Sequence, residues 1–260
     1  MPPRPARFDR FQARPQPGCV AYGVHVSLLV PEALEIYGLL GFEWAFLDAE
    51  HGPLSHETCR QLVRGADVAG IPCAVRVPQV VGAVIEGYLD AGAIGIIAPD
   101  IASADQAQAL VAATRFPPRG TRGAAGRTRA AQFGLTQPPK DFISRSNSGL
   151  FTVALIESAD GLKNAAAIAM VEGIDYVGIG PSDLSLSLGL PQGASDPALR
   201  EIVSEAHARI RATGKPLFVL AKDRSSAKAA VDSGAGLIAV PDIVLLETGA
   251  REFLPPDRPG

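Results

Sequence analysis

The chain has 260 residues, 47% hydrophobic and 20% charged, which is the composition of a soluble globular protein with room for a sizeable core. Its net charge of −3 comes without a basic stripe, which argues against a nucleic-acid partner. The three cysteines, at positions 19, 59 and 73, form no CxxC pair, so they favour free thiols in a reducing compartment over a disulfide framework or a zinc site.

The two ends of the sequence are rich in proline and arginine. Residues 1–18 and 255–260 are therefore expected to be tails, the first of them flexible, on either side of one domain at 19–254. No apolar run approaches the roughly 20 residues of a membrane helix. The N-terminal stretch also lacks the apolar centre of a secretory signal. We expect a cytoplasmic protein with no membrane partner.

Eight short apolar segments alternate with Ala-rich helical patterns. The expected strands are 20–26, 44–48, 72–77, 93–99, 151–157, 175–180, 216–220 and 236–240. They are apolar at nearly every position, as strands are when helices cover a parallel sheet. The alternation predicts an α/β fold of the (β/α)8 TIM barrel type. An open doubly wound sheet is the alternative, but no GxGxxG or Walker sequence follows the first strand.

Helix boundaries have local signals. Asp196 followed by Pro197 predicts a helix start, and Gly214 predicts the end of the same helix. The phrases AGAIG (91–95), VEGID (171–175) and SGAG (233–236) each predict a glycine turn between a helix and the next strand.

Residues 117–149 interrupt this alternation with a long segment in which four arginines lie among glycines. Loops of this length are usually lids, binding loops or interfaces, although a solvated loop is the simpler interpretation. Because the segment comes after the fourth strand, we expect it to lie near the functional end of the barrel.

In (β/α)8 barrels the reactive groups gather at the C-terminal ends of the strands. In chain order these ends supply His25, Asp48, Glu50, His51, Arg76, Asp100, Glu157, Asp183, Leu220, Lys222 and Asp242. Asp183 and Asp242 can equally be helix N-caps. Glutamate caps poorly, so Glu157 at the end of a buried strand must be paired, neutral or metal-bound.

Glu157 and Asp183 follow neighbouring strands, and two carboxylates of this kind suit Mg²⁺ or Mn²⁺. Such a site leaves open positions for a 2-oxo acid, whose developing enolate charge the metal would stabilise. Arg76 could donate to the same oxyanion. His51 could be oriented by the Asp48 carboxylate and move protons. His56 and His207 fall in helical patterns and are expected to face solvent.

Several motifs occur together in a recognisable order over roughly residues 20–250. They are FLDAEHGP (46–53), VRVP (75–78), GYLDAGAIGIIAP (87–99), PRGTRG (118–123), LIES (155–158), VEGIDYVGIGPSDLSLSLG (171–189) and GAGLIAVPDIVLL (234–246). This combination resembles the HpcH/HpaI aldolase family. The resemblance implies a divalent-metal-dependent class II aldolase of aromatic compound catabolism. Such an enzyme makes or cleaves the C3–C4 bond of 4-hydroxy-2-oxo acids, giving an aldehyde and pyruvate or a related 2-oxo acid such as hydroxypyruvate.

The resemblance also implies roles for residues. The DAEH motif carries the catalytic Asp48 and His51, and VRVP carries the catalytic and substrate-binding Arg76. LIES and GPSD carry the ligands of Mg²⁺, Mn²⁺ or Co²⁺, which are Glu157 and Asp183. The expected substrate-binding residues are completed by Gly180, Pro181, Ser182, Asp183, His25 and Leu220.

Two further implications concern assembly. Asp90, in YLDAGA, matches a position that in this family reaches toward the site of a neighbouring subunit. Family members tend to form hexamers by exchanging the terminal helix, which here would follow Val240. Two departures affect substrate preference, because Leu155 stands where many members have glutamine and His25 where many have an apolar aromatic residue.

Three other functions remain open. Lys222 after the seventh strand could form the Schiff base of a class I aldolase. An acyl-CoA lyase similar to the citrate lyase β subunit would share the barrel but needs a nucleotide-binding surface, which the sequence does not reveal. A non-catalytic sensor of 2-oxo acids is possible on any barrel.

Overall fold

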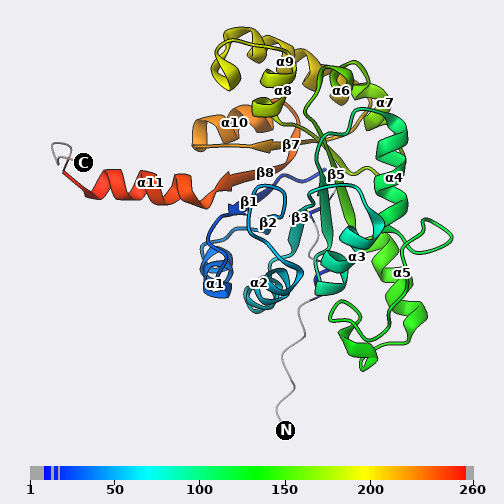
Figure 1. The fold of residues 1–260 in the computed structure, drawn as a ribbon. Coiled ribbons are helices and arrows are strands. Elements are labelled where there is room, and N and C mark those ends of the chain that lie inside the picture. Colours follow the sequence, from blue (N-terminus) through cyan, green and yellow to red (C-terminus); the bar gives the residue numbers. More distant parts are fainter. Residues whose placement is uncertain (1–8, 13–14, 17, 256–260) are drawn as a thin grey trace.

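The computed structural model describes residues 9–12, 15–16 and 18–255. Eight parallel strands pair in chain order and close on themselves, which confirms the predicted (β/α)8 barrel (Figure 1). The strands agree with the predicted ranges to within two residues at either end. They are β1 (Ala21–Val26), β2 (Trp44–Asp48), β3 (Cys73–Arg76), β4 (Gly95–Ala98), β5 (Phe151–Ile156), β6 (Tyr176–Ile179), β7 (Leu217–Leu220) and β8 (Ala235–Pro241).

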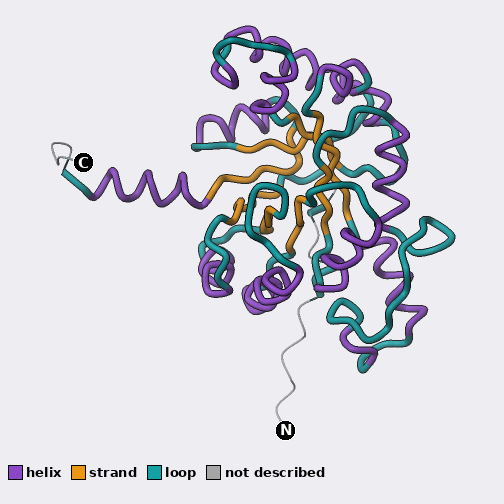
Figure 2. Tube along the Cα trace, in the orientation of Figure 1, coloured by secondary structure: helices purple, strands orange, loops and turns teal. Residues whose placement is uncertain are grey.

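Helices surround the barrel, as Figure 2 shows in purple around the orange strands. They are α1 (Pro31–Leu39), α2 (His56–Ala69), α3 (Gly82–Ala91), α4 (Ala104–Thr114), α5 (Pro139–Gly149), α6 (Ala159–Lys163), α7 (Ala165–Ala169), α8 (Pro181–Ser187), α9 (Pro197–Ala212), α10 (Arg224–Asp232) and α11 (Asp242–Phe253). Short 3₁₀ turns lie at Gln132–Gly134 and Gly193–Ser195. Within the described part of the chain, no helix combines the length and apolarity needed to cross a membrane.

The predicted helix boundaries are present. The Asp196 carboxylate accepts a hydrogen bond from the backbone N–H of Ala198 at 3.0 Å, which caps the start of α9. Gly92, Gly173 and Gly234 adopt positive φ angles of 115°, 94° and 88° between a helix and the next strand. Only glycine takes this left-handed conformation without strain, so these positions end the helices.

Aromatic rings fill the barrel interior. The ring centroids of Phe46 and Phe218 lie 5.9 Å apart at 71°, and Trp44 packs beside both of them. The Trp44 indole N–H donates to the carbonyl of Ile238 at 3.2 Å, so its one polar group is satisfied. Gly23 makes room for this ring, because a Cβ there would lie 2.4 Å from it. The interior is therefore a packed core, and its upper layer forms the floor of the mouth, the end of the barrel made by the C-terminal ends of the strands.

The strands β6 and β7 share an unusually short pairing. Only Val177 with Leu217 and Gly178 with Phe218 are in register, whereas β5 and β6 share four residue pairs. Beyond Gly178 and Phe218, therefore, β6 and β7 have no further register partners in common. This seam has the fewest register pairs of the barrel, and α9 packs against β7 beside it.

The segment 117–149 lies at the other end of the barrel. It begins after α4 has already carried the chain away from the mouth, and it leads into β5. Arg122 binds Asp90 at 2.7 Å near the end of α3, and Arg129 binds Asp67 near the end of α2. These helix ends precede strands, so they mark the N-terminal end of the barrel. The expectation that this segment lies near the mouth of its own barrel is therefore wrong.

Of the expected tails, residues 1–8, 13–14, 17 and 256–260 lie outside the described residues. Between them, Arg10 donates to the carbonyl of Gly92 at 3.1 Å and to Asp67 at 2.7 Å. Phe11 packs beside Gly149, where a Cβ would lie 2.7 Å from its ring. These contacts hold this part of the N-terminal segment against the barrel, because Asp67 binds Arg10 and the surface at Gly149 packs against Phe11.

The last helix, α11, extends away from the barrel (Figure 1). Its apolar side chains are exposed, with Ile243 at 50%, Leu246 at 51% and Phe253 at 87%. Its first residue, Asp242, is buried and accepts from the backbone N–H groups of Ser27 and Leu28 at 2.8 and 3.0 Å. The helix is therefore fixed at its base, while most of its length has no covering element among the described residues.

Candidate active site

The mouth of the barrel is organised around a two-point ion pair. Arg76, at the end of β3, donates from Nε to Asp48 Oδ1 at 2.9 Å and from Nη2 to Asp48 Oδ2 at 2.6 Å. Asp48 ends the neighbouring strand β2, and the two residues are register partners. Both side chains are largely buried. The parallel arrangement fixes the plane of the guanidinium, which a single contact would not do.

Phe46 supports this pair from below. The His25 ring stacks on the Phe46 ring with centroids 4.3 Å apart at 22°, and the Arg76 guanidinium lies 5.6 Å from the same ring. His25 Nε2 is 3.7 Å from Asp48 Oδ2. His25 therefore contacts the mouth residues directly, as a wall of the site that can also interact with Asp48.

The electrostatic balance at Asp48 favours its charged form. Burial raises the pKa of this carboxyl, but the hydrogen bonds from His25 and Arg76 and the positive charge of Arg76 hold the pKa well below its ordinary value. The backbone N–H groups of Glu50 and His51 also donate to Asp48 Oδ1, at 3.0 and 3.3 Å. The charged form of Asp48 is thus favoured, and it holds Arg76 through two hydrogen bonds.

The His51 imidazole is not paired with Asp48, which corrects the expected Asp48–His51 arrangement. Its side chain is 61% exposed, and its Nε2 is 3.9 Å from Glu50 Oε2. The reason is geometric, because both Asp48 oxygens are engaged by Arg76 and the turn folds back sharply after His51. A Cβ on Gly52 would lie only 2.5 Å from the Asp48 carbonyl oxygen. Only the backbone of His51 reaches the Asp48 carboxylate.

Glu50 belongs to the site, although the sequence assigned it no role. Its Oε2 lies 3.2 Å from Arg76 Nε and is buried without a hydrogen-bond partner. Burial raises the pKa of Glu50 against the opposing effects of Arg76 and His51, and the negative charges of Asp48 and Asp183 add to the increase. The signal in the sequence was the DAEH motif, in which Glu50 follows Asp48 by two residues at the end of a strand.

Glu157 lies just after β5, two strands along the barrel from Arg76, and the two charges interact. Its Oε2 accepts from the backbone N–H of Asp100 at 2.8 Å, and its other oxygen faces Gly180. A Cβ on Gly180 would lie 2.3 Å from Glu157 Oε1, so glycine alone lets β6 end this close. Burial raises the pKa of Glu157, and the charges of Glu50 and Asp183 raise it further.

Asp183 lies in the first turn of α8 and is exposed to solvent at the mouth. Its charge acts on both Glu50 and Glu157, so four carboxylates, with Asp48 included, share one region with the single guanidinium of Arg76. A cation would relieve this repulsion, and oxygen-only donors suit a hard divalent ion. Among the described residues, no group of three or more His, Cys, Asp or Glu is arranged to hold a metal. Glu157 and Asp183 are the two carboxylates that would hold such an ion.

A cavity of about 240 Å³ opens beside these groups. Its walls include the expected residues Arg76, Glu157, Gly180, Pro181, Ser182 and Leu220, together with Leu155. His207 of α9 also lines this cavity, and it is only partly exposed. The expectation that His207 faces solvent is therefore wrong. A helical pattern cannot show that β6 and β7 share only two register pairs beside this helix.

The other sequence-predicted residues lie elsewhere. Lys222 donates its backbone N–H to the Ser226 hydroxyl before α10, and it does not line the cavity. Asp242 is the anchor of α11, where the Tyr37 hydroxyl also donates to it at 3.1 Å. Asp90 binds Arg122 at the far end of the barrel. None of these three lines the cavity.

Comparison with known proteins agrees with this geometry. The model of the family described as HpcH/HpaI aldolase/citrate lyase matches residues 21–243. The chain is 37% identical over 233 residues to a 4-hydroxy-2-oxovalerate aldolase of Novosphingobium aromaticivorans, covering 89% of this chain and 87% of that protein. It is 36% identical over 233 residues to a 5-keto-4-deoxy-D-glucarate aldolase of Salmonella paratyphi A, covering 89% and 90%.

Among solved structures, an HpcH/HpaI aldolase/citrate lyase family protein from Burkholderia cenocepacia superposes with a TM-score of 0.84. The two share 30% sequence identity over 94% of this chain and 96% of that one. The likeness therefore extends over the whole barrel.

Proposed function

Because the chain belongs to the HpcH/HpaI aldolase/citrate lyase family and is a carbon–carbon lyase, we propose that it is a metal-dependent class II aldolase. Its substrates are 4-hydroxy-2-oxo acids, whose C3–C4 bond it cleaves or forms. The products of cleavage are an aldehyde and pyruvate or a related 2-oxo acid such as hydroxypyruvate. The observation that carries this proposal is the grouping of the Arg76–Asp48 pair, Glu157 and Asp183 at one end of the barrel.

Glu157 and Asp183 hold the divalent cation, which is Mg²⁺, Mn²⁺ or Co²⁺. The buried, electrostatically strained carboxylate of Glu157 supports this assignment, because a nearby cation stabilises its charged form. When bound, the cation supplies Lewis-acid stabilisation of the negative charge that develops on the 2-oxo group.

The residues of the chain supply orientation and proton movement. Arg76 uses Nε and Nη2 for Asp48, which leaves its other terminal nitrogen to donate to the developing enolate oxygen. Gly180, Pro181, Ser182 and Leu220 line the cavity where the 2-oxo acid carboxylate lies. His25 does not line it but lies beside it, stacked on Phe46 and 3.7 Å from Asp48. Asp48 holds the Arg76 guanidinium in place before the enolate charge develops, so this donor loses little entropy in the reaction. Asp48 therefore acts as a positioning residue for Arg76.

In cleavage, the C4 hydroxyl loses its proton to a base, and the O–H electron pair forms the aldehyde carbonyl. The C3–C4 bond breaks, its electron pair becomes the enolate, and C3 is protonated to give the 2-oxo acid. His51 is the proposed base, because its imidazole is exposed at the mouth beside Glu50.

The test is a pyruvate-release screen over several 4-hydroxy-2-oxo acids. We expect activity that EDTA abolishes and that Mg²⁺, Mn²⁺ or Co²⁺ restores. Borohydride treatment with pyruvate should not inactivate the enzyme. Inactivation would instead indicate a Schiff base, with Lys222 as its candidate.

The assembly is proposed from α11. Its exposed apolar face would be covered if each subunit placed this helix on a neighbour, as expected for a homo-hexamer. In that assembly Asp90 would approach the site of an adjacent subunit. Sedimentation velocity tests this, because Leu246→Glu should reduce the assembly size while wild-type protein remains oligomeric. The proposed location is the cytoplasm.

A further inference from the structure

The chain gains one extra residue where β4 ends at the mouth. Phe151 of β5 donates its backbone N–H to the Ile94 carbonyl at 3.0 Å. If this parallel ladder continued regularly, the Leu155 carbonyl would accept from the N–H of Asp100. It accepts instead from Ile101, at 2.8 Å. Asp100 is therefore an inserted residue, as in a β-bulge, and its N–H is released from the ladder.

The released N–H is directed at the carboxylate of Glu157. Asp100 donates to Glu157 Oε2 at 2.8 Å, and on the other side of the carboxylate a Cβ on Gly180 would lie 2.3 Å from Oε1. The backbone after β4 and the backbone after β6 thus confine the two oxygens of one buried side chain. A backbone N–H that donates to a carboxylate also favours its charged form, which is the form that binds a metal.

The insertion depends on a strained backbone. The φ angle of Asp100 is 47°, in the left-handed region, which Asp, Asn and Gly tolerate and β-branched residues do not. Among the described residues, the other non-glycine positions with positive φ are Gln132 and Phe133, which belong to the segment at the far end of the barrel. The buried Ile101 fixes the chain after the bulge, so the strain at Asp100 is held in place.

We propose that Asp100 is a positioning residue whose left-handed backbone, rather than its carboxylate, holds Glu157 in the orientation that binds the divalent cation. The role of Glu157 as a metal ligand rests on the proposed function. The Asp100 side chain is exposed, and within the described part of the chain only its backbone N–H makes a hydrogen bond. The bulge is therefore the feature through which this residue acts.

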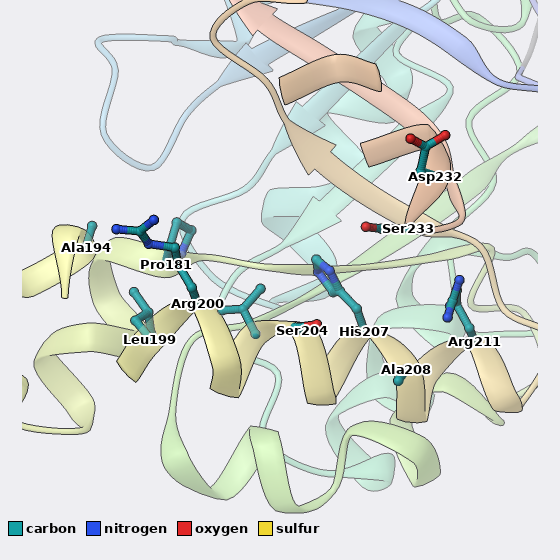
Figure 3. A pocket seen from close by; sticks show the side chains of 11 residues that line it. Pro181, Ala194, Leu199, Arg200, Ser204, His207, Ala208, Arg211, Asp232 and Ser233 are labelled. Carbon is teal, nitrogen blue, oxygen red and sulfur yellow. The ribbon is translucent and has the colours of Figure 1, made fainter. Parts of the chain in front are cut away.

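The space beside Glu157 is the mouth cavity of about 240 Å³, which Glu157 lines. A groove of about 420 Å³ adjoins this cavity along α9, and His207 lines both (Figure 3). Glu157 does not line the groove, whereas Arg200 of α9 does, as Figure 3 shows. Arg200→Ala therefore removes a charge near the site without changing the residues that confine Glu157.

Mn²⁺ titration of the full chain, followed by electron paramagnetic resonance, tests the proposal without turnover. Asp100→Gly, Asp100→Asn, Asp100→Val and Asp100→Pro all remove the carboxylate, so differences among them report the backbone. Glycine and asparagine adopt the left-handed conformation, and these variants should keep the wild-type Mn²⁺ affinity to within about threefold. Valine disfavours this conformation and proline has no N–H, so both should weaken Mn²⁺ binding by about 10–100-fold.

Gln132→Val is the matched control for strain, because it places a β-branched residue at a φ angle of 51° far from the mouth. It should lower the melting temperature and leave Mn²⁺ affinity unchanged, as should Arg200→Ala for the affinity. Circular dichroism would verify folding. Wild-type affinity in folded Asp100→Val and Asp100→Pro would overturn the proposal. A loss in Asp100→Gly as large as in Asp100→Val would also overturn it, because the carboxylate would then be the group that matters.

Turnover separates this proposal from the proposed function. Excess Mn²⁺ should restore cleavage of a 4-hydroxy-2-oxo acid by Asp100→Val, because the defect is in metal binding. EDTA-sensitive cleavage with wild-type Mn²⁺ affinity in Asp100→Val and Asp100→Pro would refute the positioning role and leave the aldolase intact. Weakened Mn²⁺ binding in these variants, without cleavage of any such acid by wild-type protein, would support the positioning role and refute the aldolase. Wild-type protein that binds no Mn²⁺ would overturn the positioning role outright.

Discussion

Arg76 and Asp48 form a two-point ion pair at the mouth of the barrel, with Nε to Oδ1 at 2.9 Å and Nη2 to Oδ2 at 2.6 Å. This relationship assigns Asp48 to Arg76 rather than to the His51 imidazole. It also means that the guanidinium is oriented before any substrate binds.

The first prediction concerns Arg76. Arg76→Ala should lower kcat for pyruvate release by about 10²–10³, the usual effect of removing one donor to a developing oxyanion. Arg76→Lys keeps the charge but cannot form the two-point contact, so it should recover only part of the activity. Steady-state kinetics measures both variants. Unchanged turnover in Arg76→Ala would refute the assigned role.

The second prediction is a pH dependence of stability. The pKa of Asp48 is lowered in the folded state, so its contribution is fully present above the ordinary value of 3.8 and is lost as the pH falls toward the folded value. Removing one partner of a buried ion pair costs about 3–5 kcal/mol. Urea denaturation should therefore show Asp48→Asn to be less stable at pH 7, with a smaller difference at pH 3. If the difference in the free energy of unfolding between wild-type protein and Asp48→Asn stays constant from pH 7 to pH 3, the lowered pKa of Asp48 is contradicted.

The third prediction concerns metal binding. Glu157→Gln and Asp183→Asn should each weaken Mn²⁺ binding by more than the roughly 10–100-fold effect of outer-shell substitutions. Because the pKa of Glu157 is raised, protons compete with the metal, and wild-type affinity should also fall as the pH is lowered. Calorimetry measures both effects, with thermal unfolding in EDTA as the check of folding. Wild-type affinity in both variants would exclude this site.

The fourth prediction uses the close approach of Gly180 to Glu157. Gly180→Ala would place a Cβ 2.3 Å from Glu157 Oε1, so the carboxylate must move. We expect weaker Mn²⁺ binding and lower kcat. Gly82→Ala is the matched control, because a Cβ there meets nothing within 4 Å. If both variants behave like wild-type protein, the position of Glu157 does not matter for metal binding.

The fifth prediction concerns the base of α11. Asp242→Ala removes the acceptor of Ser27, Leu28 and Tyr37 and should reduce the free energy of unfolding by roughly 3 kcal/mol. Burial and the Asp242 carboxylate raise the pKa of Tyr37 well above its usual range, so tyrosinate absorbance should appear at lower pH in the variant. Asp242→Asn keeps one acceptor and should be less affected. An unchanged tyrosine titration would show that this contact is unimportant.

Much of the fold was predictable because its signals are local. The apolar strands, the Asp196 cap and the glycine at position 92 depend on a few neighbouring residues, and all are present in the structure. The grouping of Asp48, Arg76 and Glu157 also followed, since closure of a parallel barrel brings strand ends together. The place of segment 117–149 did not follow, because it depends on which end of the barrel α4 reaches.

The sequence by itself determined the barrel and the set of residues at its mouth, because hydrophobic periodicity and glycine turns act over short distances. Only the tertiary structure decided which side chains pair. Asp48 binds Arg76 and turns away from the His51 ring because register aligns the ends of β2 and β3. His207 reaches the mouth cavity because β6 and β7 part early. Both outcomes depend on pairing between strands that are separated in the chain by at least one helix, so no local pattern could contain them.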